Sequence, residues 1–270
     1  MPEVTDHKKG RFDSKKVLRW IGVAEELSQK TGVPHFLDVM AMYPEAMKQY
    51  IRFVAEHSES VILIDGANPE TRLAGIEVVK ELGLQKKVIF NAIFPKMPKK
   101  ELDEVHESRI DAAILLAQNE MDYSPEGRIT VLKGFDHQVG LLEIAKKAGI
   151  KEILVDTIVF DVPSIAYAAE AVKIVKNELG YPAGCSPANA TYDWKTSKDK
   201  LLKESFSACN ASAHAFVQFS GANFLIYGPI KQAKNLIPAC AMTDAIIAYY
   251  ATKRFGTKPL VSDHPLYRIF

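Results

Sequence analysis

Six polar residues of one chemical kind recur along the chain, each within or just after a short run of apolar residues. Successive members are about 26 to 38 residues apart, and the set is Asp38, Asp65, Asn91, Gln118, Asp156 and Asn189. Carboxylates accept hydrogen bonds from N–H groups, whereas carboxamides both donate and accept them. Brought together, such side chains suit a neutral nitrogen heterocycle with an amidine-like edge, such as a guanine or a pterin.

The apolar runs around these residues predict strands. Most runs are nearly continuous in apolar character, as expected for parallel strands that are covered on both faces. The predicted strands are His35–Met42, Ser60–Gly66, Val88–Phe94, Ala112–Gln118, Glu152–Thr157, Pro182–Asn189 and Asn223–Gly228.

Amphipathic segments between the runs predict helices. Three of them, PEAMKQYIRFVAEHS, PETRLAGIEVVKELG and VPSIAYAAEAVKIVKNELG, carry proline in the first turn, and the last two close on Gly83 and Gly180. Proline at the start and glycine just past the end are the usual boundary signals of a helix. A further helix is predicted from a cap at Asp13 or Ser14 to Gly32, after a dozen polar residues.

Seven strand–helix units indicate an α/β fold. No charged linker or low-complexity stretch interrupts them, so residues 1–270 are expected to form one domain. Right-handed crossovers close such a chain into a TIM-type (β/α)8 barrel or wind it into an open sheet. The open sheet usually carries a glycine-rich phosphate loop, and neither G-x-G-x-x-G nor G-x-x-x-x-G-K-[ST] occurs. We therefore expect the barrel, with its first strand lacking or replaced by another element.

In a parallel barrel, function collects at the carboxyl ends of the strands. Asp65, Asn91, Gln118, Asp156 and Asn189 are therefore expected to line one mouth. A simpler alternative is that an Asp or Asn at a strand end only caps the next helix or forms a turn. Asp65 and Asp156 follow the apolar runs VILI and EILV, so partial burial is expected, and a buried carboxylate needs a partner.

Other chemistries find less support in the sequence. The histidines are scattered without H-x-x-x-H or H-x-H spacing, so no metal site is expected. A Ser–His–Asp triad lacks its G-x-S-x-G elbow, and no lysine ends a predicted strand. Glycoside hydrolysis by Asp65 and Asp156 stays open as a weaker alternative, since the chain has only 2 Trp for a sugar cleft.

Composition restricts the class of protein further. Apolar residues make up 47% and charged residues 25%, and the formal net charge is +1, which favours neither nucleic acid nor an anionic membrane. No apolar run is long enough to span a bilayer, and the N-terminus has no signal-peptide core. The 3 cysteines have no zinc-site spacing, which indicates a reducing cytoplasm. Cys185 is expected to be a buried thiol rather than a nucleophile.

Several segments resemble one known family. DHKKGRFD, SQKTGVPHFLDV, GYPAGCSPANATYDW and the terminal HPLYRIF are similar to the H subunit of tetrahydromethanopterin S-methyltransferase. The resemblance extends to bacterial enzymes that move methyl groups between corrinoid proteins and tetrahydrofolate. It implies a TIM-type barrel, a homodimer and a tetrahydropterin held at the carboxyl ends of the strands. Members usually carry an additional N-terminal segment that contains the first strand.

The resemblance also implies roles for individual residues. Asp65, Asn91 and Asp156 would hydrogen-bond the polar edge of the pterin, and Asn189 would lie at N5, the nitrogen that gains or loses the methyl group. Gly184 and Ser186 would lie close to the ring. Asp38 and Gln118 are included as pterin-binding candidates without a sharp motif to align them, and Cys185 has no catalytic role.

The expected function is therefore methyl transfer between a corrinoid and N5 of a tetrahydropterin. Tetrahydrofolate is the preferred pterin, and tetrahydromethanopterin is the alternative. Cobalamin would be carried by a partner corrinoid protein, and methyl displacement needs alignment of two bound reactants rather than an enzyme nucleophile. A second hypothesis is a non-catalytic scaffold subunit that binds pterin or a corrinoid protein, for which a large exposed apolar patch would speak.

Overall fold

The computed structural model describes residues 3–195 and 203–270. Contacts within the chain divide it into two compact units. The first unit comprises Met1–Arg19 and Phe36–Asp156, and the second comprises Trp20–His35 and Thr157–Phe270.

A parallel sheet forms the centre of the first unit. Its strands are β3 (Phe36–Ala41), β4 (Val61–Gly66), β5 (Val88–Ile93), β6 (Ala112–Leu116) and β9 (Glu152–Asp156). They lie in the order β9-β6-β5-β4-β3, and each pair is parallel. These five strands coincide with five of the predicted apolar runs, which confirms the sequence pattern.

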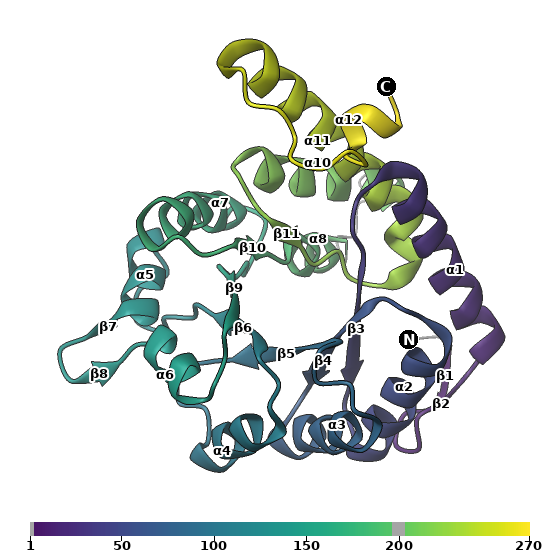
Figure 1. Ribbon diagram of the computed structural model, residues 1–270, viewed down its shortest axis with the longest axis vertical. Coiled ribbons are helices and arrows are strands. Elements are labelled where there is room, and N and C mark those ends of the chain that lie inside the picture. The colour runs from purple at the N-terminus through teal and green to yellow at the C-terminus, as the bar shows by residue number, and fades with distance from the viewer. Residues whose placement is uncertain (1–2, 196–202) are drawn as a thin grey trace. The chain divides into compact units, whose positions relative to one another are not determined.

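Helices cover one face of this sheet. The helices of the unit are α2 (Pro44–His57), α3 (Pro69–Leu82), α4 (Lys99–Ser108), α5 (Pro125–Lys133) and α6 (Leu141–Lys147). Figure 1 shows α2, α3 and α4 side by side on the outer face of the strands. On β3 the side chains of Leu37, Val39 and Ala41 are buried on the helix side. The alternate residues Phe36, Asp38 and Met40 are exposed on the opposite face.

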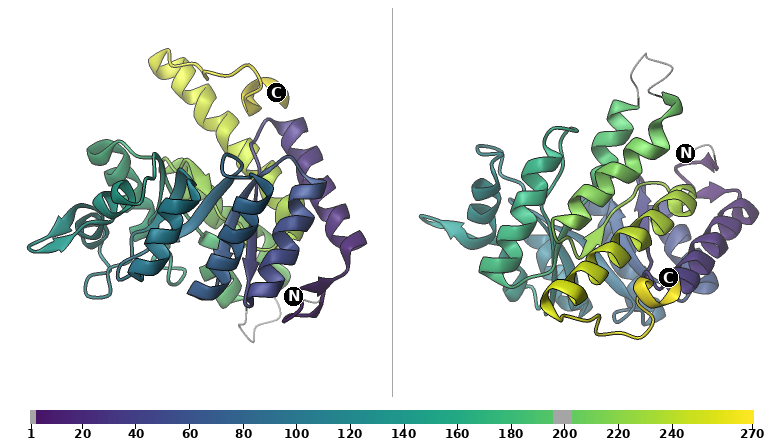
Figure 2. Two further views of the ribbon diagram at one scale, coloured as in Figure 1. Left: turned by 60° about the horizontal axis from the view of Figure 1, so that its bottom comes forward. Right: turned by 90° about the horizontal axis from the view of Figure 1, so that it is seen from above.

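The polar N-terminal segment, for which the sequence predicts no element, forms an antiparallel hairpin of β1 (Val4–Asp6) and β2 (Arg11–Phe12). Phe12 packs edge-on against two rings of α2, with centroid distances of 5.3 Å to Tyr50 and 4.8 Å to Phe53. A second small ribbon, β7 (Gly134–Phe135) with β8 (Gln138–Val139), projects from the unit in Figure 2. Both ribbons are separate from the parallel sheet.

The second unit is mainly helical. Its elements are most of α1 (Ser14–Thr31), then α7 (Ile165–Ile174), a π-helical turn η1 (Val175–Leu179), β10 (Ala183–Cys185), α8 (Pro187–Trp194), α10 (Phe206–Phe219), β11 (Phe224–Leu225), a 3-10 turn η2 (Ile230–Gln232), α11 (Ala233–Phe255) and α12 (Pro265–Arg268). Strands β10 and β11 are parallel. Helices α10 and α11 pack side by side, as the right-hand view of Figure 2 shows.

The predicted strand Pro182–Asn189 is wrong at its C-terminal end. Strand β10 stops at Cys185, and α8 begins at Pro187 with Ser186 as its N-cap residue. Proline has a fixed φ and no N–H, so it is favoured in the first turn of a helix, and the chain turns into a helix at this point. Asn189 therefore lies in the first turn of α8 and not at the end of a strand.

Two of the family-like segments meet within the second unit. Gly32, which follows α1, has φ +77°, and a Cβ atom there would lie 1.7 Å from the carbonyl oxygen of Asp263. Only glycine fits this position, because it tolerates both the positive φ and the contact with the backbone. Asp263 directly precedes the terminal HPLYRIF, so SQKTG and HPLYRIF are parts of one packing arrangement.

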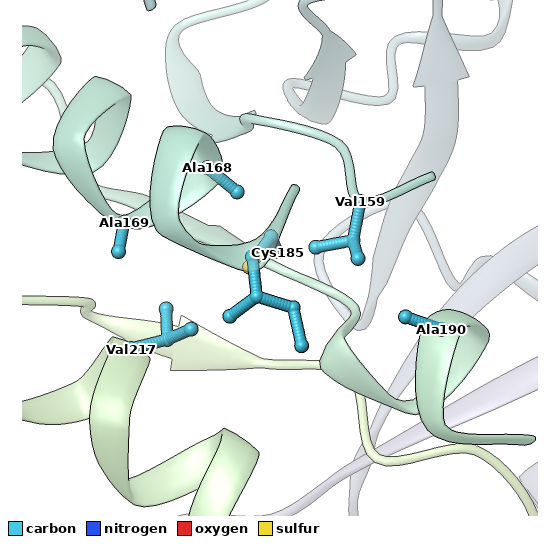
Figure 3. Close-up of a cluster of buried hydrophobic side chains, with 7 residues drawn as sticks. Val159, Ala168, Ala169, Cys185, Ala190 and Val217 are labelled. Atoms are coloured by element: carbon cyan, nitrogen blue, oxygen red, sulfur yellow. The ribbon is translucent and has the colours of Figure 1, made fainter. Parts of the chain in front are cut away.

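Cys185 is fully buried in an apolar cluster of the second unit. The cluster comprises Val159, Ile165, Ala168, Ala169, Cys185, Ala190 and Val217. Figure 3 shows Cys185 between Ala168 and Ala169 of α7 on one side and Val217 of α10 on the other. This confirms that Cys185 is a packed thiol.

The described part of the chain thus contains seven parallel strands, five in the first unit and two in the second, that alternate with helices. This is the α/β pattern of a TIM-like barrel that lacks one strand, as the sequence predicts. Among the described residues, no helix combines the length and the apolar character that spanning a bilayer requires.

Candidate functional site

Three of the predicted site residues share one face of the sheet in the first unit. Asp65 of β4 is the register partner of Asn91 of β5 on one side and of Met40 of β3 on the other. Side chains alternate along a strand, so Asp38, two residues before Met40, lies on the same face. Since the residues of β3 on this face are exposed, the face is the one opposite the helices.

Asp156 joins this group from β9, which lies beyond β6 in the same sheet. Asn91 is the partner of Ile114 in β6, and Ile114 pairs with Leu154 in β9. Asp156 follows Leu154 by two residues and therefore points to the same face. Asp38, Asp65, Asn91 and Asp156 are called the polar cluster below.

The polar cluster perturbs its own carboxyl groups. The pKa of Asp38 is raised to about 8 by burial and by the charges of Asp65 and Asp156, while a hydrogen bond from Asn91 opposes the shift. The Asp38 side chain keeps accessible surface although protein atoms surround and desolvate its carboxyl group. A carboxyl group with this pKa carries a proton at neutral pH and can donate a hydrogen bond. The cluster thus contains both donors and acceptors.

The carboxyl group of Asp65 is influenced by the positive charge of Arg72. Burial raises the pKa of Asp65, and the positive charge of Arg72 in α3 lowers it. Arg72 forms a buried two-point ion pair with Glu101 of α4, in which Nη2 lies 3.0 Å from Oε2. Its Nη1 also donates to the carbonyl oxygen of Gly66 at 2.7 Å. Arg72 is thereby fixed at the end of β4, where its charge favours the ionised form of Asp65.

The alternative that these side chains only cap helices does not hold for the polar cluster. The N-cap residues of the helices that follow β3, β4, β5 and β9 are Tyr43, Asn68, Pro98 and Ser164. Asn68 does the capping after β4, where its Oδ1 accepts a hydrogen bond from the N–H of Thr71 at 2.9 Å. Asp38 and Asn91 also lie inside their strands rather than at the ends. Helix capping therefore does not explain the four polar side chains.

Gln118 stands apart from this arrangement. It lies two residues beyond the end of β6 at Leu116 and is half-buried. The interactions that perturb Asp38 involve Asp65, Asn91 and Asp156 but not Gln118. Its assignment as a binding residue stays a prediction from the sequence.

In the second unit, Asn189 and Ser186 form a local pair. The hydroxyl oxygen of Ser186 lies 3.1 Å from Oδ1 of Asn189 and 3.2 Å from the carbonyl oxygen of Ile226. Ser186 is buried, whereas Asn189 is exposed on α8. The backbone N–H of Asn189 also donates to the carbonyl oxygen of Ser186 at 3.1 Å. The Asn189 amide is thus exposed to solvent and is held in place by the buried Ser186 hydroxyl.

The packing of two strands explains why position 184 is a glycine. A Cβ atom at this position would lie 2.0 Å from the carbonyl oxygen of Phe224 in β11. Any other residue would therefore separate β10 from β11, so the small size of Gly184 is explained by the contact between the two strands.

Sequence reasoning missed several side chains that support these groups. Arg72 and Glu101 are 29 residues apart and lie in helices that read as ordinary amphipathic segments. Thr191 of α8 and Asn210 and His214 of α10 are buried polar residues. A fully buried polar side chain is uncommon, but the sequence gives no signal of burial at these positions.

Carboxylates can also serve as metal ligands. Among residues 3–195 and 203–270, no group of three or more His, Cys, Asp or Glu side chains has an arrangement that could hold a metal ion. Hydrogen bonding is the chemistry that the contacts of the polar cluster display, as in the bond from Asn91 to Asp38.

The fold defines an α/β protein of TIM-like barrel type, and the polar cluster places hydrogen-bond donors and acceptors on one face of its sheet. The family follows from comparison with known proteins. The model of the tetrahydromethanopterin S-methyltransferase MtrH subunit matches residues 3–260, and the chain belongs to this methyltransferase family.

Curated relatives span nearly the whole chain. It is 34% identical over 271 residues to the tetrahydromethanopterin S-methyltransferase H subunit of Methanothermobacter thermautotrophicus, and the match covers 98% of this chain and 87% of the relative. The corresponding protein of Methanocaldococcus jannaschii is 35% identical with the same coverage of both chains. That of Methanopyrus kandleri is 32% identical over 97% of this chain and 86% of the relative. The resemblance that the sequence motifs indicate is confirmed.

Proposed function

We propose that this protein transfers a methyl group between N5 of tetrahydromethanopterin and a corrinoid carried by a partner protein. The observation that carries the proposal is the polar cluster, which gathers three carboxyl groups and a carboxamide on one sheet face. Membership of the MtrH family supports the reaction class.

The choice of pterin differs from the preference drawn from the sequence. Tetrahydrofolate is the pterin expected there, but the relatives are named for tetrahydromethanopterin, and nothing in the comparisons supports folate. Both cofactors share the pterin head, so the polar cluster suits either. The proposal therefore takes tetrahydromethanopterin as the substrate.

In this proposal the polar cluster binds the edge of the pterin that carries the ring N–H and amino groups. The carboxyl oxygens of Asp65 and Asp156 accept hydrogen bonds from these groups, and Asn91 donates to or accepts from the adjacent ring atoms. Asp38, protonated at neutral pH because of its raised pKa, supplies a donor. Gln118 and Gly184 are retained as residues close to the ring. Hydrogen bonds to charged groups contribute about 1.5–3 kcal/mol each, which is enough to orient a flat ring.

The reaction needs no nucleophile from the protein. The carbon–nitrogen bond at N5 breaks as the methyl group bonds to the cobalt(I) centre, which supplies the electron pair. The bond pair stays on N5, which then takes up a proton from water. We assign Asn189 to N5, where its amide supports the developing charge on the leaving nitrogen. Catalysis otherwise rests on holding the two reactants in line.

A second copy of the chain is proposed as a partner. Helix α11 exposes large apolar side chains at helical spacing, namely Met242, Ile246, Tyr249 and Tyr250. Such a stripe on an exposed face is typical of an interaction surface, and a homodimer with a two-fold axis would cover it on both subunits. The same proposal takes residues 1–270 as one methyltransferase domain that works in the cytoplasm, which fits the presence of Cys185, Cys209 and Cys240 as thiols rather than disulfides.

The same stripe also favours a second candidate function, a scaffold subunit that binds pterin or a corrinoid protein without turnover. The two candidates differ in one experiment. The protein is titrated by calorimetry with methylated tetrahydromethanopterin and with methyltetrahydrofolate, and free cob(I)alamin is then added while its optical bands are followed. The proposal predicts tighter binding of the methanopterin and conversion of the cobalt bands. Binding without a change in the bands favours the scaffold, and no binding of either pterin contradicts the proposal.

A further inference from the structure

The Ser186 hydroxyl lies between two oxygen atoms and has only one hydrogen to give. Oδ1 of Asn189 is 3.1 Å away, and the carbonyl oxygen of Ile226 is 3.2 Å away. A hydroxyl donates once but accepts through its lone pairs, whereas a backbone carbonyl only accepts. Ser186 therefore satisfies both neighbours at the same time only if Asn189 turns its NH2 group toward the hydroxyl.

Two arrangements of the Ser186–Asn189 pair follow from this count. In the first, the hydroxyl donates to Oδ1 of Asn189, and the NH2 group of the amide points away from Ser186. In the second, the hydroxyl donates to the Ile226 carbonyl and accepts a hydrogen bond from the Asn189 NH2 group, so that Oδ1 points away. Rotation of one hydroxyl thus decides whether the exposed amide presents a donor or an acceptor.

The surroundings of the pair are fixed, so only the hydroxyl and the amide have to move. The N–H of Ile226 donates to the carbonyl oxygen of Cys185 at 3.0 Å, which holds the Ile226 backbone against β10. Helix α8 is tied to α10 by the hydrogen bond from Oγ1 of Thr191 to Oδ1 of Asn210 at 2.7 Å. Ser186 occupies the N-cap position of α8, but its side chain makes no capping hydrogen bond.

His214 is a further buried polar side chain of this unit, and its Nε2 has no hydrogen-bond partner among the described residues. Its ring is fully buried, and Nδ1 lies 2.7 Å from the carbonyl oxygen of Asn210. Burial lowers the pKa of His214, and the backbone of Asn210 and that of Ile226 partly oppose this shift. Thr191, Asn210 and His214 are thus linked by hydrogen bonds into a buried polar group that connects α8 with α10.

We propose that Ser186 is a positioning residue that sets which group Asn189 presents to the reacting nitrogen. This inference rests on the proposed function. Methylated N5 carries a lone pair and needs a donor, whereas N5 after methyl transfer carries a hydrogen and needs an acceptor. The Ser186 hydroxyl lets one amide meet both needs, and it acts through Asn189 rather than on the pterin.

The kinetic test uses the full chain with methylated tetrahydromethanopterin and cob(I)alamin. We expect Ser186→Ala to lower kcat about tenfold, the loss of one positioned hydrogen bond, with the Kd of the pterin within about twofold of wild type. Ser108→Ala is the matched control, because Ser108 is also buried and donates to a carbonyl oxygen, that of Val105, in the first unit. It should leave kcat unchanged. Ser186→Cys, which keeps a weak donor, should fall between Ser186→Ala and wild type.

A double variant separates positioning from a general structural effect. In the Asn189→Ala background, Ser186→Ala should have no further effect on kcat, because the residue through which it acts is gone. Additive losses, or an equal loss in Kd and kcat, would overturn the inference.

A second readout does not depend on activity. The side-chain NH2 signal of Asn189 in the NMR spectrum of the protein without ligand, assigned through Asn189→Ala, should move in Ser186→Ala and stay in Ser108→Ala. An unmoved signal overturns the inference even if methyl transfer is confirmed. A moved signal in a protein that transfers no methyl group leaves the coupling between the two side chains intact and refutes the proposed function instead.

Discussion

Asp65 and Asn91 are register partners on neighbouring parallel strands, so their side chains leave the same face of the sheet side by side. Asp38 completes the group from the neighbouring strand β3 and Asp156 from β9, beyond β6, and the pKa of Asp38 is raised by burial and by the charges of Asp65 and Asp156. Carboxyl groups that have a perturbed pKa and cap no helix are typical of a functional site. This evidence is stronger than the positions of the residues in the sequence.

The first prediction concerns binding. Asp65→Asn and Asp156→Asn keep the shape of the side chain but remove the charged acceptor, so each should weaken the Kd of methylated tetrahydromethanopterin about 10- to 100-fold. Calorimetry measures this change directly. Asp103→Asn on the exposed surface of α4 is the control and should bind like wild type. Unchanged affinity in both cluster variants would show that the polar cluster does not hold the pterin.

The second prediction concerns pH and stability. The pKa of Asp38 is raised to about 8 in the folded protein, from about 3.9 when unfolded. The folded state therefore binds the proton more tightly, and the stability this contributes is complete below about pH 4 and is lost as the pH rises through 8. Urea unfolding of wild type should show a falling free energy of unfolding from about pH 5 to 9. The decline should be shallower in Asp38→Asn, and parallel curves would contradict the raised pKa.

The third prediction concerns the ion pair behind Asp65. Arg72 and Glu101 are both buried, so Glu101→Gln leaves an uncompensated charge and should cost about 3–5 kcal/mol of unfolding free energy. Lys80 and Glu104 offer a matched control, because they link the same two helices at 3.0 Å but are partly exposed. Glu104→Gln should cost less than about 1 kcal/mol. Equal losses for the two variants in denaturant titrations would refute this difference.

The fourth prediction concerns assembly. Ile246→Glu places a charge in the middle of the apolar stripe on α11 and should convert a dimer into a monomer, because burying an unpaired charge is costly. Light scattering coupled to size-exclusion chromatography gives the mass. Leu82→Glu, at an exposed apolar position on α3, should leave the dimer intact. A monomeric wild-type protein would refute the proposed homodimer.

Much of the fold could be predicted from the sequence because local signals agree with one another. Apolar runs and their turn residues locate β3, β4, β5, β6 and β9, and proline and glycine mark the ends of α3. The same signals identify Asp65, Asn91 and Asp156 as strand residues. Their common face then follows from the period of two along each strand, once the register is known.

The rest depends on contacts that a sequence does not display. The sequence pattern places Asn189 at a strand end because the small residues of Pro182–Asn189 contain no clear strand boundary. Pro187 is nevertheless a signal for the start of a helix. The pairing of Arg72 with Glu101 depends on how α3 packs against α4. The raised pKa of Asp38 depends on three other strands, so no local pattern around Asp38 predicts it.

The most direct test of the account is the single-turnover rate of methyl transfer from methylated tetrahydromethanopterin to cob(I)alamin, compared between wild type and Asn189→Ala. Pterin affinity and thermal stability are measured in parallel. The account predicts that the rate falls by about 100-fold or more while affinity and stability stay close to wild type, as for loss of a donor positioned for the transition state. A variant that transfers the methyl group at the wild-type rate would contradict the role of Asn189 at N5.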